Sequence, residues 1–431
     1  MQLGFLYSLF LECTCVTTDT RNCPEESMFI ALRGANFNGN AFAKQALEKG
    51  CRYAIIDDPQ YLEPNNPKIK LVEDCLKALQ DLARFHRHML LTPVLAITGT
   101  NGKTTTKELI AAVLKKKYNI LYTEGNLNNH IGVPLTLLRL RPEHNFAIIE
   151  MGASHPGDIK ELVEIAMPEC GVITNIGTAH IEGFGSLEGV RRTKCELYDF
   201  LRATNGLAFV NAEDDFLIEK SEGILRVRYG TTPGLFVSGT AEPTSLLLKV
   251  HWRSGDIESD VQTNLVGSYN LNNVLAAIAF GLGFKVPAGD INKALSEYIP
   301  TNSRSQLKRT GSNILIVDAY NANPTSMMAA LENFTNFPCD NKMIILGDMR
   351  ELGTVSQDEH HKILEYINAH NYERVILVGE EFTKAAQDSD YETYPNAETL
   401  RHVLSEDKPQ GFTILIKASN SIRLAPIADI L

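Results

Sequence analysis

The chain lacks the features that mark a secreted, zinc-stabilised or membrane-spanning protein. Its 8 cysteines are scattered and form no Cys-x-x-Cys pair, which argues against a disulfide or zinc framework. Residues 1–11 are mildly apolar without a basic segment, so they predict a first helix rather than a signal peptide. No apolar run reaches the length that crosses a bilayer, so no membrane insertion is expected. We therefore expect a cytoplasmic protein with reduced thiols.

A Lys/Arg-rich segment is also missing. The net charge is −11, which argues against nucleic acid as a partner. An acidic protein that binds an anionic ligand must instead gather positive charge locally or recruit a cation. No internal repeat is present, and the 431 residues are enough for several domains.

The most informative segment is residues 94–106. An apolar run ends in a loop of small residues, Lys103 and three threonines follow, and a helix-compatible segment then covers residues 107–117. This order predicts a phosphate site made by backbone N–H groups, a helix N-terminus and a lysine, with Thr104 placed to bind Mg²⁺. The usual leading glycine is replaced by Ile97. A chance Gly-Lys-Thr loop is the alternative, and the flanking strand and helix signals disfavour it. We predict that the chain binds ATP or GTP.

Alternation of short apolar runs with helical patterns predicts an α/β fold with three domains. These are a small α/β N-terminal domain (1–86), a central P-loop-type domain (87–302) and a Rossmann-like C-terminal domain (303–431). The central domain should hold a mostly parallel, doubly wound sheet, with an antiparallel appendage over residues 224–265. A hinge is expected at residues 300–303. The predicted strands cover residues 28–32, 53–57, 94–97, 120–122, 146–150, 171–175, 207–211, 313–317, 342–346, 374–378 and 412–416. Helices are predicted at residues 41–49, 73–88, 187–200 and 270–281.

Polar residues that follow predicted strands are candidate ligands, because open α/β sheets bind ligands at that edge. Glu150 can bind Mg²⁺ or can merely cap the next turn, and the residue alone does not decide. His180 lies in a glycine-bearing loop, which favours a ligand or phosphate role over a buried structural histidine. Lys194 lies in the helical run 187–200, where a solvated helix face is the plain alternative.

Further candidates lie before, within and after the predicted hinge. Asn270 is placed to cap the helix that follows it, whereas Asn273 is one turn further on and capping does not explain it. Asp318 follows an apolar strand and can bind a ribose hydroxyl. Arg304 in the hinge can reach a phosphoryl group that is being transferred.

Taken together, these segments resemble the Mur ligase family of ATP-dependent amide-forming enzymes of peptidoglycan synthesis. The segments that carry the resemblance lie in consistent order along nearly the whole chain: 18–21, 29–34, 98–105, 125–134 and 150–152. The phosphate loop without a leading glycine is that family's version. Residues 417–420 (Lys-Ala-Ser-Asn) depart from the frequent Lys-Gly-Ser-Arg, so the charge of that arginine must come from elsewhere or be dispensable. Arg304 also lacks the glycine that usually precedes it.

Segments 125–134, 318–327 and 347–353 are most similar to the family member that joins D-alanyl-D-alanine to UDP-N-acetylmuramoyl-tripeptide. The resemblance implies these two substrates, ATP and Mg²⁺ as cofactors, an acyl-phosphate intermediate and a monomer. A sister ligase that adds one amino acid to a UDP-muramoyl peptide or to folate is the alternative. A P-loop switch or motor and a non-catalytic muropeptide-binding protein fit less well, because neither needs this set of sites.

The resemblance also implies roles for individual residues. Lys103 would bind the β- and γ-phosphates, Thr104 and Glu150 the first Mg²⁺, and His180 a second metal. Lys194 would be the lysine that several members carbamylate, so Lys103, His180 and Lys194 form the catalytic set. The nucleotide would be held by Thr100, Asn101, Gly102, Thr105, Asn273, Arg304 and Asp318. Substrate contacts would come from Thr18, Asp19, Thr20, Arg21, Asn38, Asn40, Asn128, Asn129, Asn321 and Asn323.

Overall fold

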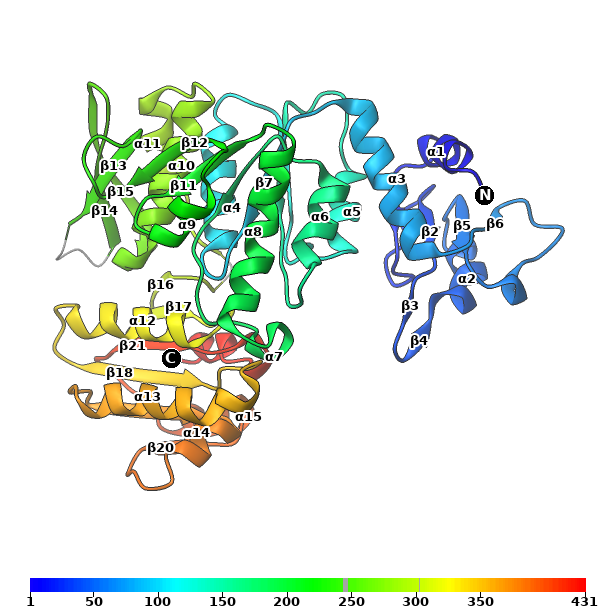
Figure 1. Cartoon of the computed structure of the whole chain (residues 1–431). Helices are drawn as coiled ribbons and strands as arrows, with labels where there is room; N and C mark the ends of the chain where they lie inside the picture. The colour runs from blue at the N-terminus through cyan, green and yellow to red at the C-terminus, as the bar shows by residue number, and fades with distance from the viewer. Residues whose placement is uncertain (243–246, 302) are drawn as a thin grey trace.

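The computed structural model describes residues 1–242, 247–301 and 303–431 (Figure 1). It confirms an α/β chain built on three separate main sheets. Residue 302 of the expected hinge and residues 243–246 of the expected appendage lie outside the described residues. In the described parts of the chain, no helix is both long and apolar enough to span a bilayer.

The N-terminal sheet is small and parallel. Its strand order is β1-β2-β5-β6, and a two-stranded hairpin, β3-β4, stands apart from it. The strands are β1 (Val16–Thr17), β2 (Met28–Ile30), β3 (Arg33–Gly34), β4 (Phe37–Asn38), β5 (Tyr53–Ile56) and β6 (Ile69–Leu71). The helices are α1 (Leu3–Leu11), α2 (Ala43–Glu48) and α3 (Cys75–Leu90). The expected first helix is therefore confirmed.

Helix α3 leads from this sheet into the central one. The side chain of Asp74 accepts a hydrogen bond from Lys77 N (2.8 Å) and so caps its first turn. Leu79, Leu82 and Ala83 are buried at helical spacing. The helix ends at Leu91, whose φ of 52° is left-handed.

The central sheet has nine strands in the order β15-β14-β13-β12-β11-β10-β7-β9-β8. Pairings from β13 to β8 are parallel, and those of β14 are antiparallel. The strands are β7 (Val94–Thr98), β8 (Ile120–Tyr122), β9 (Phe146–Glu150), β10 (Cys170–Ile173), β11 (Leu207–Asn211), β12 (Leu225–Gly230), β13 (Val237–Ala241), β14 (Leu247–Ser254) and β15 (Ile257–Val266). The helices are α4 (Lys103–Leu114), α5 (Gly132–Leu137), α6 (Asp158–Ala166), α7 (Ile181–Phe184), α8 (Leu187–Ala203), α9 (Asp215–Lys220), α10 (Leu271–Gly283) and α11 (Ala288–Glu297).

The expected antiparallel appendage is confirmed, but it begins later than residue 224. Strand β12, inside the predicted antiparallel appendage, pairs parallel with β11 and extends the main sheet. The antiparallel pairings there, β13–β14 and β14–β15, begin later along the chain, and β14 and β15 are 8 and 10 residues long rather than short. The two faces of the sheet are covered separately, with α4, α10 and α11 packed on one apolar cluster and α5, α6 and α8 on the other.

The C-terminal sheet has the order β16-β17-β21-β18-β19-β20. Its first pairing is antiparallel and the others are parallel. The strands are β16 (Gln306–Arg309), β17 (Ile314–Asp318), β18 (Lys342–Gly347), β19 (Arg374–Val378), β20 (Glu392–Tyr394) and β21 (Thr413–Lys417). The helices are α12 (Pro324–Asn336), α13 (Ser356–Asn368), α14 (Glu380–Ala385) and α15 (Ala397–Glu406). Helices α12, α13 and α14 pack on one face and α15 on the other, as in a doubly wound unit.

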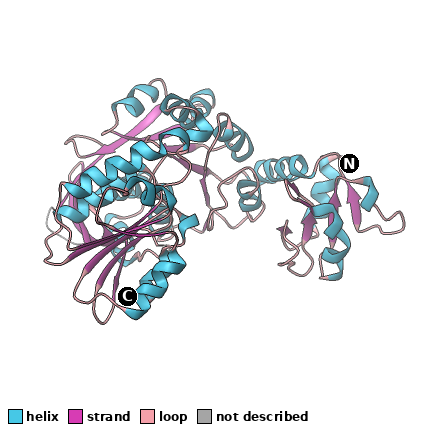
Figure 2. Cartoon of the chain, turned by 90° about the horizontal axis from the view of Figure 1, so that it is seen from below, coloured by secondary structure: helices cyan, strands magenta, loops and turns pink. Residues whose placement is uncertain are grey.

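The three units are arranged with the central one in the middle. In Figures 1 and 2 the N-terminal unit extends to one side, away from the C-terminal unit, which lies against the central one. Val266 N at the end of β15 donates to Ser305 O (3.2 Å), which ties the two larger units where the chain passes between them. The carboxyl ends of the central parallel strands face this junction, so ligand-binding loops are expected there.

Candidate active site

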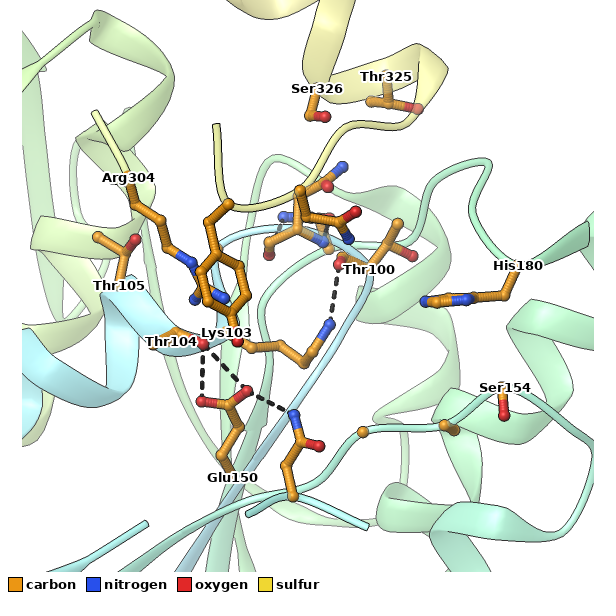
Figure 3. Close-up of a pocket in the computed structure, with 18 of the residues that line it drawn as sticks. Thr100, Lys103, Thr104, Thr105, Glu150, Ser154, His180, Arg304, Thr325 and Ser326 are labelled. Atoms are coloured by element: carbon orange, nitrogen blue, oxygen red, sulfur yellow. Dashed lines mark hydrogen bonds between the residues drawn. The ribbon is translucent and has the colours of Figure 1, made fainter. Parts of the chain in front are cut away.

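A cleft of about 800 Å³ lies between the central and C-terminal units. Its floor is the loop after β7, and its far wall is formed by the loop after β17 and by α12 (Figure 3). Many of the predicted site residues line it: Thr100, Asn101, Gly102, Lys103, Thr104, Thr105, Asn128, Asn129, Glu150, His180, Asn273, Arg304, Asp318 and Asn321. Residues predicted from separate segments of the sequence therefore lie around one cleft.

The loop after β7 has the form that a phosphate site needs. Strand β7 lies between β9 and β10, and its five residues are buried. Gly99 and Gly102 adopt φ of 138° and 78°, which lets the backbone curl around an anion before α4 begins. A Cβ on Gly102 would stand 2.5 Å from Asn273 Oδ1, so the close packing of α10 also requires glycine here.

Lys103 points back over this loop. Its Nζ donates to the carbonyl oxygens of Gly99 (2.8 Å) and Thr100 (2.9 Å). Burial is the main cause that lowers the pKa of Lys103 to about 8; the charge of Glu150 opposes this shift and that of Arg304 adds to it. An anion bound in the loop would favour the charged form of this lysine.

Glu150 stands at the end of β9 and is almost completely buried. Its carboxylate accepts hydrogen bonds from Thr104 Oγ1 (3.0 and 2.9 Å) and from Asn128 Nδ2 (2.9 Å). A hydroxyl and a carboxylate oxygen in contact are ligands that Mg²⁺ prefers, so this pair fits the ion. No group of three or more His, Cys, Asp or Glu side chains placed to hold a metal occurs among the described residues, so the remaining ligands would be phosphate oxygens and water.

His180 begins α7 with a left-handed φ of 53°, which turns its ring into the cleft. Its Nδ1 pairs with the Glu351 carboxylate, which comes from the loop after β18 in the C-terminal unit. This contact lowers the pKa of Glu351. The ring therefore links the two units, and whether it serves a second metal stays a prediction.

Lys194 lies in α8, behind the cleft wall, and is buried rather than on a solvated helix face. Its Nζ is 5.8 Å from the centroid of the Phe184 ring. Burial holds the pKa of Lys194 well below its ordinary value, and the nearby charge of Lys103 lowers it further. The surroundings of Lys194 therefore favour the neutral amine more than those of an exposed lysine do.

The capping role expected for Asn270 is wrong. Its side chain makes no cap hydrogen bond; Nδ2 donates to Val266 O (2.9 Å) and Ser305 Oγ (3.1 Å). Its Oδ1 accepts from Asn273 Nδ2 (2.9 Å), while Asn273 Oδ1 accepts from Thr106 Oγ1 (3.0 Å). The two asparagines therefore connect the domain junction to the first turn of α4.

Arg304 and Asp318 approach the cleft from the junction. The Arg304 guanidinium lies 3.7 Å from the centroid of the Tyr320 ring. Asp318 Oδ2 pairs with the buried Lys417 Nζ (2.6 Å), and its Oδ1 accepts from Ser305 N (3.3 Å). Lys417, the first residue of segment 417–420, thus orients the carboxylate of Asp318, which is predicted to bind ribose.

Among the predicted substrate residues, Asn321 and Asn129 hold their own loops, because each Oδ1 accepts from nearby backbone N–H groups. Asn323 caps α12 through a reciprocal pair with Ser326. Its Nδ2 also donates to Asn101 Oδ1 (2.8 Å), which joins the C-terminal unit to the phosphate loop.

The predicted uridine residues lie elsewhere, in the N-terminal unit (Figure 1). Asp19 and Arg21 form an exposed ion pair (2.7 Å) in the loop that also holds Thr18 and Thr20. Asn40 is buried and its Nδ2 donates to Asn38 Oδ1 and Asp57 Oδ1 (both 2.8 Å). In the described part of the chain, no N-terminal residue lines the cleft.

Several residues at the site were missed in the sequence. Asn175 holds the phosphate loop, because its Oδ1 accepts from Asn101 N (3.0 Å) and its Nδ2 donates to Asn101 O (2.9 Å). Lys107 and Lys417 are fully buried cations beside Glu150 and Asp318. The sequence does carry a signal for Lys417 as a site residue, because Lys417 ends an apolar run just as Asp318 does.

Three family models match the chain in order. They are the Mur ligase family catalytic domain over residues 12–87, the Mur ligase middle domain over 97–281 and the Mur ligase glutamate ligase domain over 303–420. The chain belongs to the Mur ligase family.

Within that family, particular relatives are similar over nearly their full length. UDP-N-acetylmuramoyl-tripeptide–D-alanyl-D-alanine ligase of Bacillus subtilis is 36% identical over 426 residues, 96% of this chain and 92% of that protein. The Escherichia coli ligase of the same name is 34% identical and covers 98% and 95%. Among solved structures, MurF from Acinetobacter baumannii has a TM-score of 0.87 at 30% identity, covering 100% of this chain and 98% of that one. MurF from Thermotoga maritima in complex with ADP has a TM-score of 0.84 at 25% identity, covering 98% and 97%.

Proposed function

We propose that this chain is an ATP-dependent ligase that joins D-alanyl-D-alanine to UDP-N-acetylmuramoyl-tripeptide in peptidoglycan precursor synthesis. The observation that carries the proposal is the shared cleft: the phosphate loop, Glu150 and the loop after β17 face one another across it. Two relatives named for this activity are similar over 96% and 98% of the chain.

The reaction must activate a carboxylate before an amine can attack it. In the proposed sequence, an oxygen of the tripeptide's terminal carboxylate attacks the γ-phosphorus of ATP, and the bond to the β-phosphate oxygen breaks to release ADP. The amine of D-alanyl-D-alanine then attacks the acyl carbon, loses a proton and expels phosphate. Two anions meet in the first step, which accounts for the cations gathered around the cleft.

Each residue of the phosphate loop has a part in that step. Backbone N–H groups of the loop and Lys103 would hold the β- and γ-phosphates, as would the N-terminus of α4. Thr104 and Glu150 would hold Mg²⁺, which neutralises charge on the transferred phosphoryl group when it is bound. Arg304, Asp318 and Asn273 line the part of the cleft that would take the nucleoside.

Lys194 is proposed to react with carbon dioxide. Its neutral amine would form a carbamate with loss of a proton, which changes a cation into an anion beside the metal site. The lowered pKa of Lys194 supports this step, because only the unprotonated amine is nucleophilic. His180, on the same side of the cleft, would serve a second metal.

The domain roles follow from the same proposal. Residues 1–86 would bind the uridine nucleotide, residues 87–302 ATP, and residues 303–431 D-alanyl-D-alanine. We propose a monomer in the cytoplasm, where ATP is available and thiols stay reduced. The 8 free cysteines are consistent with that compartment.

The deciding experiment measures phosphate release by the purified chain. UDP-muramoyl peptides of different length would be tested with D-alanyl-D-alanine, with single amino acids and with no amine, and folate with glutamate would be included. Release that needs both the UDP-tripeptide and the dipeptide is expected, and Lys103→Ala should abolish it. Equal release with a single amino acid would favour a sister ligase, and release without either substrate would favour a nucleotide switch.

A further inference from the structure

Lys107 is a buried cation for which the reaction above has no use. It lies on α4, one turn after Lys103, and its side chain is fully buried. Burial of a lysine costs several kcal/mol in order of magnitude unless the charge is paired and hydrogen-bonded. The position is therefore either a structural ion pair or part of the site.

The contacts of its ammonium group are specific. Nζ donates to Thr123 O (2.6 Å) and pairs with Glu108 Oε1 (2.9 Å). It stands 3.8 Å from Glu150 Oε2. Thr123 also contacts the backbone of Glu150, because its Oγ1 accepts from Glu150 N (3.0 Å). Lys107 and Thr123 thus connect the end of β8 to the residue predicted to hold Mg²⁺.

The 3.8 Å between Lys107 Nζ and Glu150 Oε2 is longer than a hydrogen bond. Thr123 O and Glu108 hold the ammonium back, so it attracts the Glu150 carboxylate without donating a short hydrogen bond to it. Two neutral donors, Thr104 Oγ1 and Asn128 Nδ2, contact the carboxylate directly. A fixed charge behind the carboxylate can set its direction while its oxygen atoms stay available to a cation.

We propose that Lys107 is a positioning residue that holds the Glu150 carboxylate against Thr104 in the arrangement that binds the Mg²⁺–nucleotide complex, an inference that rests on the ATP-dependent function proposed above. Removal of a residue that orients a metal ligand typically weakens metal binding by about 10- to 100-fold. Coulomb's law alone gives the opposite sign, because loss of an ammonium group should tighten binding of a divalent cation. The sign of the effect therefore separates positioning from simple repulsion.

The test uses Mn²⁺ as the probe and electron paramagnetic resonance to measure its binding in the presence of ADP. Lys107→Met removes the charge, and Lys107→Gln keeps a donor for Thr123 O. Both should raise the dissociation constant of Mn²⁺ by about 10-fold or more. ADP affinity without metal should stay unchanged, because the phosphate loop is intact. Lys115→Met is the matched control, since Lys115 is exposed at the end of the same helix, 4.2 Å from the Tyr122 ring centroid.

Unchanged or tighter Mn²⁺ binding by folded Lys107→Met would overturn the proposal, and so would an equal loss in Lys115→Met. A parallel loss of metal-free ADP affinity would show that Lys107 only supports the fold, which also overturns it. If the Met variant does not fold, the Gln variant decides, because it keeps a side-chain donor near Thr123 O. Absence of Mn²⁺–ADP binding by the unaltered chain would instead refute the proposed function itself.

Discussion

We expect the hydrogen bond between Asn323 and Asn101 to align the C-terminal unit with the phosphate loop. Asn323 has two separable contacts: Oδ1 caps α12 through Ser326 N (2.9 Å), and Nδ2 donates to Asn101 Oδ1 (2.8 Å). Serine is as good an N-cap as asparagine but is too short to reach across. Asn323→Ser therefore removes the contact between the units and leaves the helix capped.

The magnitude follows from one neutral hydrogen bond. Its net contribution is about 0.5–1.5 kcal/mol, which corresponds to a factor of about 2 to 12 in an equilibrium constant. We expect kcat/KM for D-alanyl-D-alanine to fall by that factor in the phosphate-release assay. The ATP dissociation constant should stay unchanged, because Asn175 still holds Asn101 N (3.0 Å) and O (2.9 Å).

A double-mutant cycle with Asn101→Ala tests the coupling. If the contact carries the effect, the double variant loses no more than the larger single loss, whereas independent residues give additive losses. Asn396→Ser is the matched control, because Asn396 caps α15 in the same way (Thr399 N, 2.9 Å) on the far side of the unit. Additive losses, or an equal effect in the control, would refute the reasoning.

Three further predictions concern the phosphate loop and its surroundings. Lys103 has a pKa of about 8 without ligand, and a bound polyphosphate must raise that pKa. ATP binding should therefore take up a proton near pH 9 and weaken as the pH rises above 8. Calorimetry in buffers of different ionisation enthalpy measures the proton uptake, and zero uptake contradicts the prediction. Lys194→Ala should lose phosphate release and regain part of it with added short carboxylates, which replace the carbamate; full activity without them contradicts the role. Gly102→Ala should weaken ATP binding at least about 10-fold, because it combines a φ of 78° with a 2.5 Å contact; Gly125→Ala, which has a φ of 56° but open space around it, should not.

Long apolar strands were predictable because a parallel sheet buried on both faces needs continuous runs of apolar residues. Strands β9, β11 and β19 begin and end where the sequence predicted. Short edge strands such as β1 and β20 have no such run. The direction of β12 was not predictable, because pairing depends on where the chain returns and not on local composition.

The site was predictable where function depends on backbone geometry. The loop from Thr98 to Thr106 and the acid at the end of β9 carry strong local patterns. Lys194 and Lys107 carry none, because burial of a lysine is decided by the elements that pack over it. The prediction for Asn270 was wrong because tertiary contacts decide its role as well. Its position matches a cap, but its side chain bonds to Val266 O and Ser305 Oγ at the domain junction.

One physical requirement connects these observations. An acidic chain of net charge −11 must bind a polyanion, and it does so by burying ammonium groups behind the phosphate loop. Burial lowers the pKa of both Lys103 and Lys194, so the charged form of each is unfavourable while no ligand is present. A bound polyphosphate would relieve that cost at Lys103, and a carbamate on Lys194 would turn its repulsion from Lys103 into attraction. The same cleft is thereby unfavourable when empty and favourable when loaded, which is the condition for binding energy to align two substrates before the carboxylate is activated.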